Sequence, residues 1–562
     1  MNYIPAWLSR TLLQTRRAKA VALALLVSAS ASAQAVNVLT YHNDVSRTGW
    51  NSGETSLTSS VIGSPSFGLL HQVALDAKVD AQPLVVAGLT IGGAVHNVVY
   101  VATEGNTIYA IDASSGAILL HTNLGTPAPW PAACSTTATV GITSTPVINR
   151  VSHTLYVMAY VFVGGTAEYY LHALSLTTLA DTQTPVMLSA AHTLADGTTL
   201  YNFNAGVTRQ RAALLNANGN IYAGFTGFCE KKIKGSRGWL LGWNASTLAP
   251  LANYLSNQVL PNNAPNDFLL TSIWMSGYGP SAAPNGNVFF VTGNSDPSGT
   301  TYDKTKAINL SESVVEWSPS QGKVVSYFSP TDSGSDVATL DREDLDFGSG
   351  GVMLLPTQPG TVARLAVAAG KVGIMYLMKQ GNLGGENSGH VLGEYQVGGC
   401  WCGPSYFTGS DGVGRVVSSG GANIIVWKVQ TSPTTTLQVD TGFTSPSIAT
   451  GQNLGFFTSI SSNGTTAGSA IIWAVSRPVA GSTDVRLFAF DASSGVQLFS
   501  ATAGTWPQAA DANIVPTIAN GNVLVASYKM LFIFGVASPG QMLIPKFKLA
   551  RPAPPPGTTA FE

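Results

Sequence analysis

Charge is what this sequence most lacks. Asp, Glu, Lys and Arg make up 10% of its 562 residues, against about 25% in an average soluble domain. Together with 59 Gly residues, this scarcity favours tight turns and short strands over amphipathic helices with charged outer faces. The net charge of −1 argues against a nucleic-acid-binding protein, which needs a basic surface.

Several motifs of common enzyme and cofactor classes are also missing. The four Cys residues form no C-x-x-C or C-x-x-C-H, which disfavours a zinc ribbon and a covalently attached c-type haem. The eight His residues are scattered, with no H-E-x-x-H. Neither a G-x-S-x-G elbow nor a phosphate-binding G-x-x-x-x-G-K-[ST] loop occurs.

Apolar runs long enough to span a membrane are absent, but a short run lies near the N-terminus. Four basic residues precede the run Val21–Val27, and Ala31-Ser-Ala33 follows it. This pattern predicts a secretory signal peptide over residues 1–33, because the run is far shorter than the ~20 residues of a membrane span. Cleavage after Ala33 or Ala35 would leave Gln34 or Val36 as the first residue of an exported protein, periplasmic or extracellular. The pair Arg16-Arg17 leaves a twin-arginine route open.

The rest of the chain is a repeat. Thr107–Gly116 and Arg486–Gly495 read alike: each is an apolar strand followed by Asp-Ala-Ser-Ser-Gly. Such a turn predicts a hairpin, in which Asp or Ser bonds its own backbone and Gly takes a positive φ. Apolar strands that open further units recur along the chain at Asn97–Ala102, Thr154–Ala159, Gly219–Gly224, Asn287–Thr292, Leu365–Ala369, Ile471–Val475 and Asn522–Ala526.

A period of roughly 45–75 residues is typical of a β-propeller with one four-stranded sheet per unit. With a blurred unit across Gly420–Ser461, the pattern predicts an all-β, eight-bladed propeller over residues 36–545. The last unit lacks a strand, so we expect the segment near Val36–Tyr41 to pair with the strand near Tyr528–Val536 and close the ring. Residues 546–562, which are rich in Pro, are expected to form a flexible tail.

The Asp-Ala-Ser-Ser-Gly hairpins resemble the repeat of the pyrroloquinoline-quinone (PQQ) dehydrogenases and their PQQ-like relatives. The resemblance implies the quinoprotein alcohol dehydrogenase fold but not the chemistry. Some PQQ-like propellers are not enzymes, including the lipoprotein that assists outer-membrane assembly. The site residues must therefore decide the function.

Four blocks between Trp274 and Tyr406 resemble the site motifs of the dehydrogenases, in the same order. The first runs from Trp274 to Pro280 and leads into a strand ending at Asn294. The resemblance makes Trp274 the floor beneath the quinone and Asn294 a calcium ligand. An indole stacks on a flat quinone, and an amide oxygen suits Ca²⁺.

The other three blocks supply the remaining candidate residues. Asp346 lies where the family has its catalytic base, and the same carboxylate is a candidate metal ligand. Lys371 lies where a cation contacts the quinone oxygens and polarises the carbonyl that receives the hydride. Trp401 matches a residue that lines the cofactor. Taken alone, each of these residues is also compatible with a core, turn or surface role.

The sequence also departs from the family in ways that put the cofactor in doubt. The quinoproteins hold the quinone against a disulfide of adjacent cysteines, but here only Cys134 occurs in that region. Gly206–Ala213 lacks the glutamate that completes the calcium site and carries Arg209 and Arg211 instead. Cys400 and Cys402 would close only a small, strained ring. Pairing of Cys134 with Cys229 and free thiols are equally open.

Three hypotheses follow. The first is an exported PQQ-dependent dehydrogenase, with Ca²⁺, that oxidises an alcohol, polyol or sugar. It would pass electrons to an external acceptor because it carries no haem. The second is a cofactor-free PQQ-like propeller that binds a protein or a polysaccharide. The third is an enzyme of other chemistry that uses the acidic residues between Asp341 and Asp346.

Overall fold

The structure is a computed structural model of the chain. It describes residues 35–544 apart from 132–135, 194–197, 199, 229–235, 252–271, 296–309, 333, 453 and 509. The compact unit Ala35–Glu562 contains the whole propeller. The predicted signal peptide, the predicted tail, Cys134 and Cys229 lie outside the described residues.

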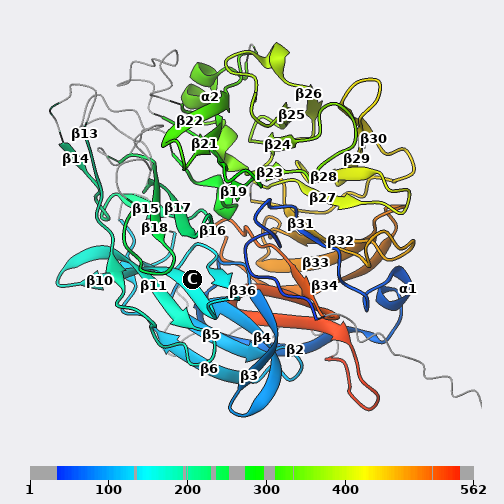
Figure 1. The fold of residues 1–562 in the computed structure, drawn as a ribbon. Helices are drawn as coiled ribbons and strands as arrows, with labels where there is room; N and C mark the ends of the chain where they lie inside the picture. The colour runs from blue at the N-terminus through cyan, green and yellow to red at the C-terminus, as the bar shows by residue number, and fades with distance from the viewer. Residues whose placement is uncertain are drawn as a thin grey trace, which may run out of the picture. The chain divides into compact units, whose positions relative to one another are not determined.

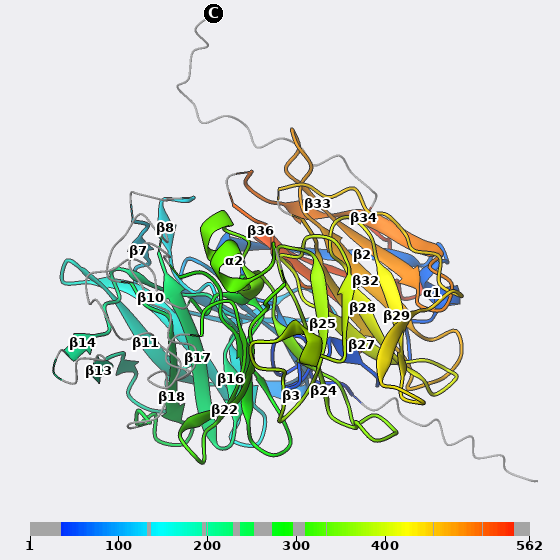
Figure 2. The ribbon, with the colours of Figure 1, turned by 90° about the horizontal axis from the view of Figure 1, so that it is seen from above.

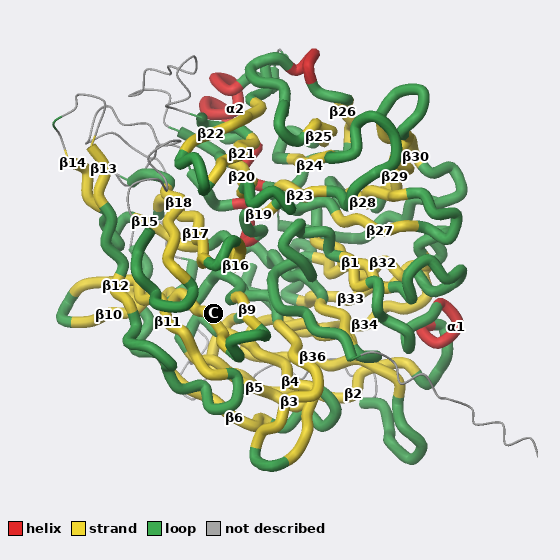
Figure 3. The backbone as a smooth tube through the Cα atoms, viewed as in Figure 1, coloured by secondary structure: helices red, strands yellow, loops and turns green. Residues whose placement is uncertain are grey.

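The fold is an eight-bladed β-propeller, as the repeat predicts (Figure 1). The sheets follow one another around the ring in chain order, and most of the regular structure is strand (Figure 3). Blade 1 consists of β3 (Leu84–Ile91), β4 (Ala94–Ala102), β5 (Thr107–Asp112) and β6 (Ile118–Asn123), and blade 2 of β9 (Val147–Asn149), β10 (Thr154–Val163), β11 (Thr166–Ser175) and β12 (Val186–Met187). Blade 3 consists of β15 (Thr208–Gln210), β16 (Leu215–Ala217), β17 (Asn220–Gly227) and β18 (Trp239–Asn244), and blade 4 of β19 (Ser281–Ala282), β20 (Val288–Val291), β21 (Val314–Ser318) and β22 (Lys323–Phe328).

Blades 5–8 complete the ring. Blade 5 consists of β23 (Val352–Leu354), β24 (Leu365–Ala369), β25 (Ile374–Lys379) and β26 (Gly393–Gln396), and blade 6 of β27 (Ser405–Thr408), β28 (Gly414–Ser418), β29 (Ile425–Gln430) and β30 (Thr436–Val439). Blade 7 consists of β31 (Phe457–Ser461), β32 (Ile471–Ser476), β33 (Asp484–Asp491) and β34 (Gln497–Thr505), with β1 (Trp50–Asn51) added to β31. Blade 8 consists of β35 (Thr517–Ala519), β36 (Asn522–Val536) and β2 (Phe67–Lys78).

A few short elements lie outside the blades. Two strand pairs and five helical turns are described: β7 (Ala128–Pro129) with β8 (Thr139–Val140), β13 (Ala191–Thr193) with β14 (Leu200–Asn202), α1 (Ser59–Ile62), α2 (Val337–Glu343), and the 3₁₀ turns η2 (Met275–Gly277), η4 (Phe347–Ser349) and η5 (Ser388–His390). In Figure 2, where the ring is turned by 90°, α2 lies toward one end of the blade strands.

The hairpins form for the reason that the sequence suggests. Asp112 Oδ1 accepts the backbone N–H groups of Ser114 and Ser115 at 2.9 and 2.8 Å, and Gly116 has φ 71°. Asp491 makes the same two bonds in blade 7, both at 3.0 Å. The apolar strands that open the units in the sequence are the second strands of the blades, and β20 and β24 are buried along their whole length.

Two details of the predicted ring are wrong. The strand that pairs with residues 528–536 of β36 is β2, not the segment Val36–Tyr41. The sixth blade begins at Ser405, before the predicted Gly420–Ser461. Both errors have one cause, because strand pairing is set by partners that are distant in the sequence rather than by local pattern.

Residues 36–54, which we call the N-terminal strap, run along the inside of the ring instead (dark blue in Figure 1). The strap makes a hydrogen bond at or next to the inner strand of every blade. Its partners from blade 1 to blade 8 are Val85, Ile148, Leu214, Ala282, Leu354, Tyr406, Ile460 and Asn520. A single segment thus joins all eight blades, in agreement with a closure role for the polar residues around His42 and Arg47.

Candidate functional site

The five candidate residues lie at one edge of blades 4–6. Trp274, Asp346 and Trp401 precede the inner strands β19, β23 and β27, whereas Asn294 and Lys371 follow the second strands β20 and β24. The inner and second strands are antiparallel, so the start of one and the end of the next share an edge. Propeller topology therefore brings together residues that are far apart in the sequence.

Asp346 is the centre of the group. Its side chain is 8% exposed, and Oδ2 lies 2.6 Å from Lys371 Nζ. Oδ1 accepts the backbone N–H of Asn294 at 2.9 Å. Gly293 permits this approach, because a Cβ there would lie 2.8 Å from Asp346 Oδ1. The carboxylate is thus oriented by one ammonium and one amide, and lone pairs remain on both oxygens.

Lys371 joins this carboxylate to the aromatic part of the site. Its Nζ also contacts Asp344 Oδ1 at 3.1 Å and lies 4.4 Å from the centroid of the Trp401 ring. Burial disfavours the charged amine, but the Asp346 and Asp344 carboxylates outweigh burial and raise the pKa of Lys371 above its ordinary value. Lys371 is therefore a fixed cation.

The two tryptophans contact each other edge to face. The ring centroids of Trp274 and Trp401 are 5.1 Å apart, at an interplanar angle of 86°. Both residues are partly exposed. Rings at right angles can form the floor and one side of a slot for a flat ligand, but they cannot hold it between parallel faces.

Asn294 and Glu312 bring two oxygens to this site that make no hydrogen bond within the described part of the chain. Asn294 is 2% exposed; its Nδ2 donates to Asp344 Oδ1 at 2.6 Å, and its Oδ1 has no partner there. Glu312 is fully buried between β20 and β21. Its Oε2 accepts the backbone N–H of Phe347 at 2.5 Å, and its Oε1 has no partner there.

Glu312 is a functional candidate that the sequence motifs do not reveal. Burial, followed by the neighbouring Asp346 and Asp341 carboxylates, raises its pKa well above the usual range. The sequence does contain a signal for Glu312. It lies two residues before the buried strand β21, and an acid in such a place is unusual in a chain so poor in charge. Among the described residues, no group of three or more His, Cys, Asp or Glu is arranged to hold a metal ion. Asn294 is not one of these four residue types, although its amide oxygen can also bind a metal ion.

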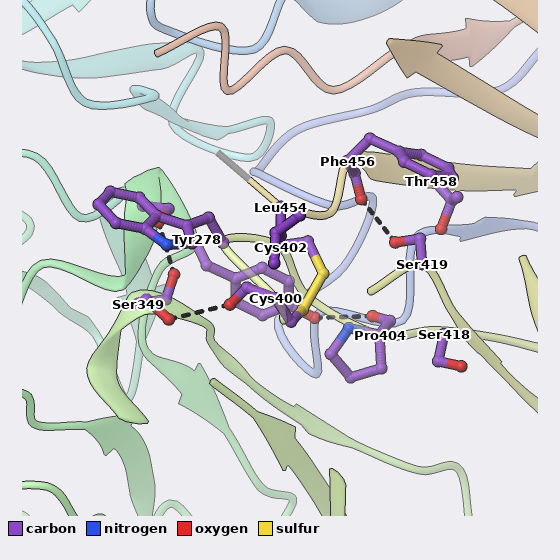
Figure 4. Close-up of a disulfide and its surroundings, with 12 residues drawn as sticks. Tyr278, Ser349, Cys400, Cys402, Pro404, Ser418, Ser419, Leu454, Phe456 and Thr458 are labelled. Carbon is purple, nitrogen blue, oxygen red and sulfur yellow. Dashed lines mark hydrogen bonds between the residues drawn. A yellow bond between two sulfur atoms is a disulfide. The ribbon is translucent and has the colours of Figure 1, made fainter. Parts of the chain in front are cut away.

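The residues on either side of Trp401 form a disulfide. Cys400 and Cys402 are bonded, with their Cα atoms 4.9 Å apart (Figure 4). Of the arrangements that the sequence leaves open for these two residues, the structure has the disulfide, and this distance lies within the usual range. Cys400 O accepts the Ser349 hydroxyl at 2.9 Å, and Trp401 O accepts a bond from Arg477 Nη2 at 2.6 Å. Pairing of Cys134 with Cys229 is not tested, because both lie outside the described residues.

A second ionic cluster lies on blades 8, 1 and 3, at the same edge of the ring as the Asp346 group. No motif in the sequence points to this cluster. Lys78 Nζ lies 3.0 Å from Asp80 Oδ2 and 3.1 Å from Glu104 Oε1, and all three side chains are at most 5% exposed. Arg211 Nη2 lies 3.9 Å from Asp80 Oδ1. A Cβ at Gly277, whose φ is 92°, would lie 2.1 Å from Arg211 Nη1, so this cluster adjoins the Trp274 loop.

The protonation of Glu104 gives this cluster a measurable pH dependence. Burial raises the pKa of Glu104 from 4.5 to about 8, and Lys78 only partly opposes the shift. A carboxyl that is protonated in the folded state stabilises it at low pH, and this contribution is lost as the pH rises through the raised pKa. We therefore expect the stability advantage of wild type over Glu104→Gln to fall by about 1 kcal/mol per pH unit between pH 5 and pH 8.

Urea unfolding of both proteins at several pH values measures this difference. Glu386→Gln is the matched control, because Glu386 is exposed and lies outside this cluster. A constant difference between wild type and Glu104→Gln would contradict a protonated Glu104.

The strap lies beside these loops and shares Tyr278 with them. Tyr278 belongs to the block that begins at Trp274, and its hydroxyl donates to Arg47 O at 2.7 Å. The Tyr278 ring also packs against Tyr41 and His42, at centroid distances of 5.3 and 5.1 Å. Burial lowers the pKa of His42 to about 4, so this imidazole is neutral at neutral pH. Its Nε2 lies 2.9 Å from Thr458 O, so the imidazole connects the strap to blade 7.

No helix in the described part of the chain is long and apolar enough to cross a membrane. The sequence matches no protein-family model and no curated protein. Solved structures, in contrast, match over most of the chain. A quinohemoprotein alcohol dehydrogenase from Comamonas testosteroni is 14% identical, with a TM-score of 0.56 over 89% of this chain and 80% of its own.

Two further structures agree. A quinohemoprotein alcohol dehydrogenase from Pseudomonas putida is 14% identical, with a TM-score of 0.54 over 93% of this chain and 82% of its own. A europium-containing methanol dehydrogenase is 11% identical, with a TM-score of 0.57 over 89% of this chain and 98% of its own. Identities this low establish the fold alone. This chain therefore shares the eight-bladed β-propeller fold of these alcohol and methanol dehydrogenase structures.

Proposed function

We propose that the protein is an exported quinoprotein-type dehydrogenase that oxidises an alcohol, a polyol or a sugar with PQQ and passes the electrons to an external acceptor. The observation that carries the proposal is the buried Asp346–Lys371 pair, 2.6 Å apart, beside the Trp274 and Trp401 rings. A base, a fixed cation and an aromatic floor at one edge are the groups that quinone-dependent alcohol oxidation needs.

The residues present fit the cofactor. PQQ is flat and carries three carboxylates. The Trp274 ring is partly exposed, and Arg209 and Arg211 place cations on blade 3, where Arg211 adjoins the Trp274 loop. Arg209 Nε and Arg211 Nη2 have no hydrogen-bond partner among the described residues. A metal ion would be held by Asn294 and Asp346.

Each side chain has a defined task in the proposed reaction. Bound PQQ supplies the hydride acceptor. Asp346 binds the substrate hydroxyl and takes its proton, because Asn294 N and Lys371 Nζ fix both carboxylate oxygens without using all their lone pairs. Lys371 remains charged throughout and stabilises negative charge that develops on a neighbouring oxygen. The Cys400–Cys402 disulfide holds the Trp401 ring in place.

Reconstitution tests the proposal. Purified protein incubated with PQQ and Ca²⁺ and then passed through a gel-filtration column should retain the quinone absorbance. Lys371→Ala should weaken retention about 10- to 100-fold, because it removes a charge-assisted contact. Lys379→Ala, an exposed site on β25, is the matched control and should behave as wild type. Loss of the chromophore from wild type would refute the proposal.

Export is part of this proposal. A signal peptide over residues 1–33 would leave the propeller over 36–545 and the tail over 546–562 outside the cytoplasm. Mass spectrometry of the exported protein should find Gln34 or Val36 at the N-terminus. Retention of residues 1–20 would contradict export with cleavage.

A cofactor-free propeller that binds a protein or a polysaccharide is the second candidate function. The observation in its favour is Arg209 and Arg211 in the segment where the dehydrogenases carry a metal-binding glutamate. A protein that binds no quinone in the reconstitution experiment would favour this alternative.

A further inference from the structure

The missing glutamate of the metal site has a replacement elsewhere in the structure. Gly206–Ala213 offers no carboxylate, and Arg211 from that segment contacts Asp80. Glu312, on blade 4, is instead adjacent to the site. Its backbone N–H bonds Gly293 O at 3.2 Å, directly before Asn294. Its Oε2 bonds the N–H of Phe347, directly after Asp346.

The position of Glu312 is unusual for a structural residue. It is fully buried and has φ 49°, a left-handed conformation that is costly for a residue other than Gly. One carboxylate oxygen binds the Phe347 amide, and the other is buried with no partner in the described part of the chain. A strained backbone and an unpaired buried oxygen in one residue indicate a requirement other than folding.

Asn294 provides a second, independent indication. Its backbone N–H and Nδ2 are used by Asp346 and Asp344 at 2.9 and 2.6 Å, which fixes the side chain. Its Oδ1 is nevertheless buried and has no partner among the described residues. The two unpartnered oxygens thus belong to residues that contact Asp346 and its neighbour Phe347, one near the start and one near the end of the β20–β21 connection. Carboxylate and amide oxygens are the ligands that Ca²⁺ prefers.

We propose that Glu312 supplies the carboxylate ligand of a divalent-cation site completed by Asn294 Oδ1 and Asp346. The inference rests on the proposed function for the expectation that a cation is present, and it assigns the missing ligand to blade 4. A cation there gives both unpartnered oxygens a positively charged partner, which the described residues do not provide.

Calorimetric titration of Ca²⁺ into the quinone-free protein tests the assignment. Wild type should bind one Ca²⁺, and Glu312→Gln should bind it at least 10-fold more weakly. The Gln side chain has the same shape, and its amide oxygen can accept the Phe347 N–H, so the fold should be retained. Glu386→Gln, an exposed site on the neighbouring blade, is the matched control and should bind as wild type. Unchanged affinity in Glu312→Gln, or no binding by wild type, would overturn the proposal.

A thermal-shift measurement provides a second variant and a second readout. At one Ca²⁺ concentration, the rise in Tm should be smaller for Asn294→Ala and Glu312→Gln than for wild type and Glu386→Gln. An equal Ca²⁺-induced shift in Asn294→Ala would also count against the site. These outcomes can be distinguished from those of the PQQ experiment. If the protein retains quinone but Glu312→Gln binds Ca²⁺ as tightly as wild type, only this inference fails. If Ca²⁺ binding depends on Glu312 but the protein retains no quinone, only the proposed function fails.

Discussion

Asp346→Asn should lower kcat of the PQQ- and Ca²⁺-loaded protein by about 10²- to 10⁴-fold, the range typical of losing a general base. The amide has the shape of the carboxylate and can still accept the Asn294 N–H, which lies 2.9 Å from Oδ1. It cannot take the proton of the substrate hydroxyl at neutral pH. Steady-state kinetics with an artificial electron acceptor measure the effect.

Two measurements separate lost chemistry from lost structure in this variant. The quinone absorbance retained by Asp346→Asn should remain measurable, because Trp274, Trp401 and Lys371 are unchanged. Asp484→Asn is the matched control, because Asp484 is an exposed residue of β33. It should leave kcat within a factor of two. Full activity in Asp346→Asn would remove this residue from the proposed chemistry.

Arg47→Ala should destabilise the protein more than any other single change in the strap. The Arg47 side chain is fully buried. It donates to Pro280 O at 2.9 Å, to Tyr41 O at 2.9 Å and to Leu214 O at 3.1 Å. Truncation leaves three buried carbonyl oxygens without a donor, and each costs about 1–3 kcal/mol. We expect a loss of about 3–5 kcal/mol in the free energy of unfolding, measured by denaturant titration.

The control for this prediction is Arg342→Ala. The Arg342 side chain is 60% exposed and pairs with Glu343 on the surface, so its loss should cost less than about 1 kcal/mol. A similar cost for both variants would mean that the Arg47 hydrogen bonds contribute little to the stability of the joined blades.

How much of the site the sequence reveals depends on where each residue lies relative to a recognisable strand. Asp346, Lys371 and Asn294 stand out in short motifs beside apolar strands, and the structure brings them into contact. Glu312 also lies beside such a strand but belongs to no motif. Its significance appears only in the structure, where Glu312 and Asn294, each with an unpartnered buried oxygen, contact the Asp346–Phe347 segment.

The sequence by itself determined the repeat, the hairpins and the eight-bladed architecture. These follow from local physical chemistry: alternating apolar residues form half-buried strands, and Asp-Ala-Ser-Ser-Gly turns satisfy their own backbone. The tertiary structure alone decided that β2 closes the ring, that the strap joins the blades, and that Cys400 bonds Cys402. It also brought Glu312 to Asp346 and Lys78 to Glu104. Apart from the disulfide, these contacts join residues whose proximity depends on how the chain runs around the ring, and no local pattern encodes that path.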